Sequence, residues 1–339
     1  MPEYEKYVCS RAGVPSCFHQ NFVNTGYRRE SGSILTCLQS AFWPTNETFN
    51  FWTHFVASIM LMSRTGRIIS EFETPFEALH LPFYIHSFGS CYLLVVSSFA
   101  HLFCCYSERC CHRCFAVDQA AVVLYALCVL LGFEHLTCPM SCYGPFNDLS
   151  RAVYMGCVVI LTVLHTMFSV QTSHSSYSPA LRSLPCTLMT LLIILPCIVR
   201  VTMNIDEPGC FPTTNKSYDY FAAVCFLAQT LFISLGGFFF SSCIPERFYP
   251  GKYDIIGNSH QLFHICSALA MYFQSLLIEG HKLIYLLVTI RCFRYSRNNL
   301  SVTWACTVGV FSLVFVLTHT TVLLHDRTRP NIVKITKIT

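Results

Sequence analysis

Charged residues are scarce in this chain of 339 residues, where Asp, Glu, Lys and Arg together make up 12%. Soluble domains carry roughly 25% charged residues, and a soluble surface cannot be built from so few. No block of Lys and Arg exceeds two adjacent residues, which excludes the basic stripe of a nucleic-acid-binding protein. The 21 cysteines are scattered through apolar runs of a long chain, which excludes a small disulfide scaffold.

Hydrophobic residues are abundant instead, at 53%, and they gather in long charge-free stretches such as residues 78–107 and 152–181. A helix of about 20 mainly apolar residues crosses a membrane. The sequence therefore predicts an all-α, polytopic membrane helix bundle. We expect seven core transmembrane helices, at residues 49–69, 81–106, 115–134, 152–171, 183–202, 220–243 and 258–287. An eighth is expected near the C-terminus, at residues 300–324.

The spans divide the chain into a cytoplasmic N-terminal segment (1–48), a seven-helix core with an intramembrane His/Asp site (49–290), an eighth transmembrane helix (291–325) and a C-terminal tail (326–339). Lys and Arg favour cytoplasmic loops. With the N-terminus in the cytoplasm, 13 of them fall in inner segments and 6 in outer ones, so this orientation is expected. Eight spans would also place the C-terminus inside, whereas seven would place it outside.

The predicted loops carry two kinds of modifiable residue. Asn215 heads an Asn-Lys-Ser sequon in an outer loop and is a glycosylation candidate. Three outer cysteines can pair in ways that the sequence leaves open: Cys138, Cys142 and Cys210. An inner cluster has three alternative interpretations, as reduced thiols, as S-acylation sites or as a thiolate metal site: Cys104, Cys105, Cys110, Cys111 and Cys114.

Histidines inside the predicted membrane region are the most informative residues, because an ionisable side chain at a helix centre costs about 2.5 kcal/mol or more. His260 and His264 are four positions apart, on one face of the seventh helix. His101 lies near the inner end of the second helix, with Ser97 one turn deeper. Asp118 is expected in the first turn of the third helix. The alternating directions of the helices place all five side chains at one depth.

Three imidazoles would fill three of the four tetrahedral positions of zinc, and a water would complete the site. Ser97 and Asp118 would then support the ligands. The alternative is that each histidine is a hydrogen-bonded packing residue, the usual interpretation of a single intramembrane histidine. Glu47, Asn50 and His54 are expected to form a polar cap at the entrance of the first helix, with a role in the site as the alternative.

Five ordered motifs carry a family resemblance between about residues 26 and 290: residues 26–28 (GYR), 45–54 (TNETFNFWTH), 97–101 (SSFAH), 115–118 (FAVD) and 245–264 (beginning PERFYPG and ending GNSHQLFH). The chain resembles the progestin and adipoQ receptor family, specifically its membrane progestin receptor branch and the gamma- and delta-like members. Gln119 departs from the Tyr that usually follows the Asp in that family, which can alter packing beside the site.

The resemblance implies an intramembrane zinc with His101, His260 and His264 as ligands and with Ser97 and Asp118 behind them. It further implies a plasma-membrane receptor for progesterone-like steroids that signals rapidly without the nucleus, with G proteins as partners. None of this steroid chemistry follows from the spacing of the residues.

Two other functions remain as alternatives. A zinc-dependent lipid amidohydrolase of the ceramidase kind would use the same histidines, with a metal-bound water of pKa near 7 and Asp118 as general base. The motif therefore does not choose between receptor and hydrolase, and the receptor is preferred because the motifs match the progestin branch. A transporter is disfavoured because the sequence has no inverted repeat.

Overall fold

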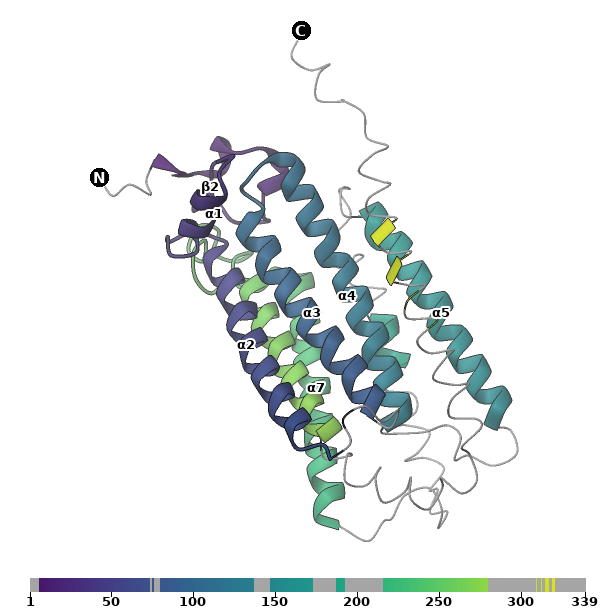
Figure 1. Cartoon of the computed structure of the whole chain (residues 1–339). Helices are drawn as coiled ribbons and strands as arrows, with labels where there is room; N and C mark the ends of the chain where they lie inside the picture. Colours follow the sequence, from purple (N-terminus) through teal and green to yellow (C-terminus); the bar gives the residue numbers. More distant parts are fainter. Residues whose placement is uncertain are drawn as a thin grey trace.

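The computed structural model describes residues 6–73, 75, 80–136, 147–172, 187–192, 216–279, 309, 312, 315–316 and 319–320. Long helices run alongside one another through most of it (Figure 1). They are α2 (Thr48–Ser70), α3 (Leu81–Phe103), α4 (Glu108–Leu136), α5 (Asn147–Thr172), α7 (Lys216–Ser242) and a further helix, Ser259–Glu279. The expected all-α bundle is confirmed.

Apolar surface marks this bundle as a membrane protein. Within the described residues, four helical stretches are long and apolar enough to cross a bilayer: Phe83–Phe103, Glu108–Gly132, Ala223–Ser242 and Ser259–Glu279. Large apolar side chains such as Leu227 and Leu231 of α7 are exposed. Such surfaces are unfavourable in water but suit contact with lipid. The exact number of spans stays a prediction.

The described helices shift several expected boundaries. The start of α4 at Glu108 was predicted wrongly, at residue 115, so Asp118 lies in the third turn and not in the first. Hydropathy does not reveal this end of the helix, because charged residues interrupt the apolar stretch without preventing helix formation. An acidic residue in the first turn even favours the helix by interacting with its dipole.

Other expectations fall partly or wholly outside the described residues. Of the expected helix at 183–202, residues 187–192 are described as helical. Of the expected eighth helix, only residues 309, 312, 315–316 and 319–320 are described. The tail at 326–339 lies outside the described residues. So do Asn215, Cys138, Cys142 and Cys210.

The N-terminal segment, expected only as a cytoplasmic segment at 1–48, folds into a cap at one end of the bundle (Figure 1). Its strands β1 (Val8–Cys9) and β2 (Tyr27–Arg28) pair antiparallel. Two short 3-10 helices, η2 (Arg11–Gly13) and η3 (Ser16–Phe18), lie between the strands. Helix α1 (Ile34–Ser40) follows, and the hydroxyl of its N-cap residue Ser33 accepts a hydrogen bond from the backbone N–H of Thr36.

Two features hold the cap against the loop that precedes helix Ser259–Glu279. The Asp254 carboxylate accepts hydrogen bonds from the backbone N–H groups of Asn24 and Thr25, at 3.2 and 2.7 Å. Gly26 has a φ of +79°, and a side chain there would approach Ile255 Cδ1 to 2.4 Å. Only glycine meets both requirements at this position. The cap is therefore fixed to the loop that precedes helix Ser259–Glu279.

Helices α3 and α4 pack closely at Gly89, because a Cβ atom there would lie 2.5 Å from Cys128 Cβ. Small residues permit such close approach between membrane helices. We expect Gly89→Ala to destabilise the bundle by about 1–3 kcal/mol through overpacking, seen as a lower thermal midpoint in detergent. Gly66→Ala in α2 is the matched control, since nothing lies within 4 Å of the added Cβ. Equal effects of the two substitutions would contradict this packing argument.

Candidate metal centre

His260 and His264 owe their position to a well-capped helix start. Asn258 Oδ1 accepts a hydrogen bond from the backbone N–H of Gln261 at 3.0 Å, and the Gln261 side chain accepts one from Gly257 N–H at 2.6 Å. These reciprocal bonds resemble a capping box and fix the first turn of helix Ser259–Glu279. The two histidines therefore enter the bundle on one face, one turn apart.

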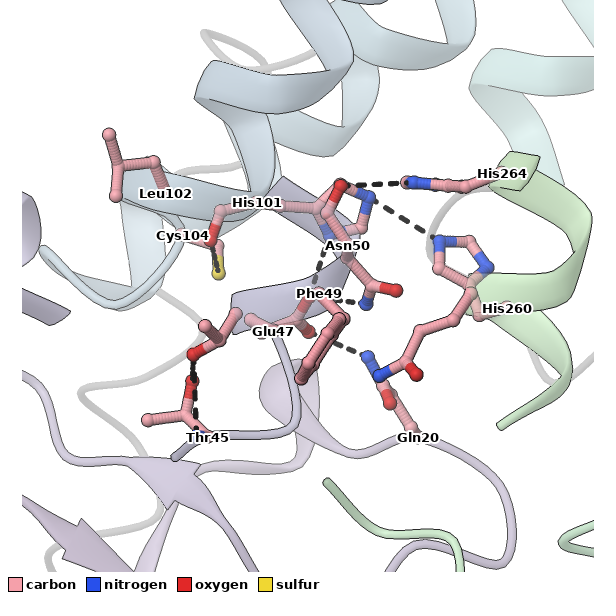
Figure 2. A network of polar contacts seen from close by, with 12 residues as sticks. Gln20, Thr45, Glu47, Phe49, Asn50, His101, Leu102, Cys104, His260 and His264 are labelled. Carbon is pink, nitrogen blue, oxygen red and sulfur yellow. Dashed lines mark hydrogen bonds and ion pairs between the residues drawn. The ribbon is translucent and has the colours of Figure 1, made fainter. Parts of the chain in front are cut away.

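His101, from the last turn of α3, meets these two histidines in the interior. The candidate ligand atoms of His101, His260 and His264 all lie within 4.8 Å of one another. The Nε2 atoms of His101 and His260 are 3.4 Å apart (Figure 2). Metal–nitrogen bonds of about 2.0–2.1 Å in a tetrahedral site separate two ligand atoms by about 3.3–3.4 Å. The three histidines form a cluster that can hold a metal ion.

Hydrogen bonds from α2 and the residue before it orient two of the imidazoles. His101 Nδ1 lies 2.7 Å from Glu47 Oε2, and His264 Nδ1 lies 3.1 Å from the backbone carbonyl oxygen of Asn50 (Figure 2). When each Nδ1 donates its proton to these oxygens, each Nε2 keeps a lone pair for a metal. Acceptors behind a ligand imidazole are the usual support of a metal site.

Glu47 is buried and serves the site more directly than a polar cap would, since its side chain makes no capping hydrogen bond to α2. Its carboxylate accepts hydrogen bonds from Gln20 Nε2 at 2.6 Å and Asn50 Nδ2 at 2.8 Å, besides the contact with His101. Burial raises the pKa of Glu47, but His101, Arg28 and Asn50 outweigh it and hold the pKa at about 2. The carboxylate is therefore charged.

His54 lies beside the cluster without joining it. Its ring stacks on that of His264, with centroids 3.7 Å apart and planes 7° apart. Its Nε2 atom is 3.1 Å from Ser267 Oγ. His54 thus fixes the plane of the His264 ring from the side of α2.

Asp118 lies near Ser97 and near enough to His101 for an electrostatic interaction. Asp118 is not among the grouped ligand atoms. Its Oδ1 atom is nevertheless buried without a hydrogen-bond partner among the described residues. An unpaired buried carboxylate oxygen near one of the three clustered imidazoles fits a site that takes a cation or a metal-bound water. The donor set and this oxygen therefore fit a metal centre.

Arg28 supports the site from the cap, a role that sequence reasoning missed although the residue lies in the GYR motif. Its buried guanidinium donates to the backbone carbonyls of His101 and Leu102 and to Ser40 Oγ. The last carbonyls of a helix have no partner within the helix. Arg28 thus closes the end of α3 at the turn that carries His101. Gln20 was also missed, because nothing in its local sequence signals a contact with Glu47.

A family model described as Haemolysin-III related matches residues 42–275, which include His101, His260 and His264. The chain belongs to the Haemolysin-III related family. The resemblance to progestin and adipoQ receptors is thereby confirmed. This Haemolysin-III related chain is also similar to curated relatives that are named membrane progestin receptors.

For three of these relatives, the alignment with this chain covers most of the relative's length. The membrane progestin receptor gamma-B of Danio rerio is 30% identical over 286 residues, which cover 78% of this chain and 79% of the relative. The membrane progestin receptor gamma of Mus musculus is 30% identical, covering 83% and 84%. The membrane progestin receptor delta of Homo sapiens is 30% identical, covering 77% and 75%.

Proposed function

We propose that this protein is a plasma-membrane receptor for progesterone-like steroids that signals without the nucleus, with G proteins as coupling partners. The observation that carries the proposal is the 30% identity, over most of both chains, to relatives named membrane progestin receptors. The predicted domain division supports it, with a seven-helix core at 49–290 that contains the histidine cluster.

The proposal includes a zinc ion held by His101, His260 and His264, with Ser97 and Asp118 behind these ligands. Zinc prefers tetrahedral sites with nitrogen and sulfur donors, and three imidazoles with one open position match that preference. A bound zinc would supply a positive charge that attracts water or a carbonyl oxygen. Glu47 and Asn50 hold two of the imidazoles in the orientation that such binding needs.

A steroid offers a rigid apolar body with one or two polar ends, which suits a site between apolar helices with a few polar groups. The buried polar side chains around the histidine cluster are such groups. Signalling further requires that the steroid bind two helix arrangements with different affinities. We place the N-terminus in the cytoplasm, and protection of an N-terminal epitope from protease added to intact cells tests this orientation.

Binding of tritiated progesterone to the purified protein in lipid nanodiscs tests the function. We expect saturable binding that unlabelled progesterone displaces, while empty nanodiscs bind in a non-saturable way. A purely non-saturable signal from folded protein would overturn the receptor assignment. Incubation of the same samples with ceramide addresses the hydrolase alternative, because fatty acid release that is lost in His264→Ala would show turnover instead.

A further inference from the structure

A second group of metal-ligand side chains lies where the N-terminal cap meets α4. Candidate ligand atoms of Cys17, Glu108 and His112 all lie within 4.8 Å of one another. Cys17 belongs to η3, whereas Glu108 and His112 occupy the first two turns of α4. Because these two residues are four positions apart, they share one face of the helix.

Cys111, whose sulfur is not among these grouped atoms, offers a fourth donor beside them. It lies three positions after Glu108, on the same face of α4, and its side chain is buried against the cap. Its thiol donates a hydrogen bond to the Cys17 carbonyl oxygen, at 3.6 Å. Two thiols, one imidazole and one carboxylate thus converge from two separate segments of chain.

Such a mixed set matches the donors of a structural zinc site, in which four protein ligands close the coordination sphere. Thiolate ligands select zinc over magnesium or calcium, which prefer oxygen alone. We propose that Cys17, Glu108, Cys111 and His112 bind a structural zinc ion, distinct from the histidine cluster. Binding would release the thiol protons and leave two thiolates on the metal.

The consequence of this site is mechanical. Val14, Phe18 and Tyr27 of the cap belong to one buried hydrophobic cluster together with Cys104 and Cys111. A metal bonded to both η3 and α4 would therefore fix the cap, and with it the strand that ends in Arg28. For Cys111, such a metal would select the thiolate metal site among the three interpretations of the inner cysteines.

Cobalt provides the test, because thiolate ligation of Co²⁺ gives a near-ultraviolet charge-transfer band that a site of three histidines cannot give. The full-length protein in detergent is loaded with Co²⁺ under a reducing agent. We expect this band in wild type and in His260→Ala. In Cys17→Ser, where Cys111 is the one remaining thiolate, we expect a band of about half the intensity and a fall in Co²⁺ affinity of at least about tenfold. Cys110→Ser, which changes the neighbouring thiol on α4 outside the group, is the matched control.

Three results would contradict the proposed zinc site. Absence of the band in folded wild type, or an unchanged band and Co²⁺ affinity in both Cys17→Ser and His112→Asn, would overturn the proposal. So would a free-thiol count showing that Cys17 and Cys111 form a disulfide under the reducing conditions used. Because His260→Ala leaves the thiols in place, failure of the proposed steroid receptor or of its central zinc would not remove the band.

Discussion

Replacing His260 by alanine should remove the ion bound at the histidine cluster. We expect the zinc content of the purified protein to fall by one ion per chain, as measured by elemental analysis. Its Nε2 atom lies 3.4 Å from that of His101, at the spacing of two ligands on one metal. Loss of supporting groups alone costs about 10–100-fold in metal affinity, so the loss of a ligand should exceed that range.

Two further variants are compared with His260→Ala in the same measurement. His165→Ala removes another buried histidine, one that lies on α5 and is not part of the cluster, and it should leave the zinc content unchanged. Glu47→Gln should keep the ion at saturating zinc but bind it about 10–100-fold more weakly, because Glu47 only orients His101. Equal zinc content in wild type and His260→Ala would refute the assignment of His260 as a ligand.

Replacing Arg28 by methionine should give the largest loss of stability of any change outside the helices. The substitution removes the charged donor of the His101 and Leu102 carbonyls and leaves them only weak thiol donors, so we expect a cost of about 2–5 kcal/mol. Thermal unfolding in detergent, followed by loss of the monodisperse peak in size-exclusion chromatography, measures this effect. Zinc affinity should fall as well, because the last turn of α3 positions His101.

Arg29→Met is the matched control, since this neighbouring arginine is exposed and should tolerate the change with little effect. Arg28→Lys should be intermediate, because lysine keeps the charge but lacks the planar fork that reaches several acceptors. If Arg28→Met unfolds at the same temperature as Arg29→Met, the capping role of Arg28 is wrong.

Long apolar stretches made the helix bundle predictable, because each such stretch can satisfy its backbone only as a helix inside a membrane. Helix ends were less predictable, as the early start of α4 at Glu108 illustrates. Charge reports where the lipid ends, whereas hydrogen bonding and capping decide where a helix ends.

Some roles of polar residues near the site follow from local sequence, whereas others depend on contacts between distant segments. The i, i+4 spacing of His260 and His264 reveals a shared face without any structure, since helical geometry is local. The contact of Glu47 with His101 joins residues 54 positions apart, and no local pattern encodes it. Arg28, at the end of α3, depends on how the N-terminal cap folds back onto the bundle.

Sequence alone determined that this chain is a membrane helix bundle and which histidines share a helix face, because hydropathy and helical periodicity act over short stretches of chain. Tertiary structure alone decided that Glu47 supports His101 and that Arg28 closes α3. It also decided that Cys17 meets the start of α4. Each of these contacts joins segments that are distant in the chain, and their meeting depends on the packing of the whole bundle and its cap.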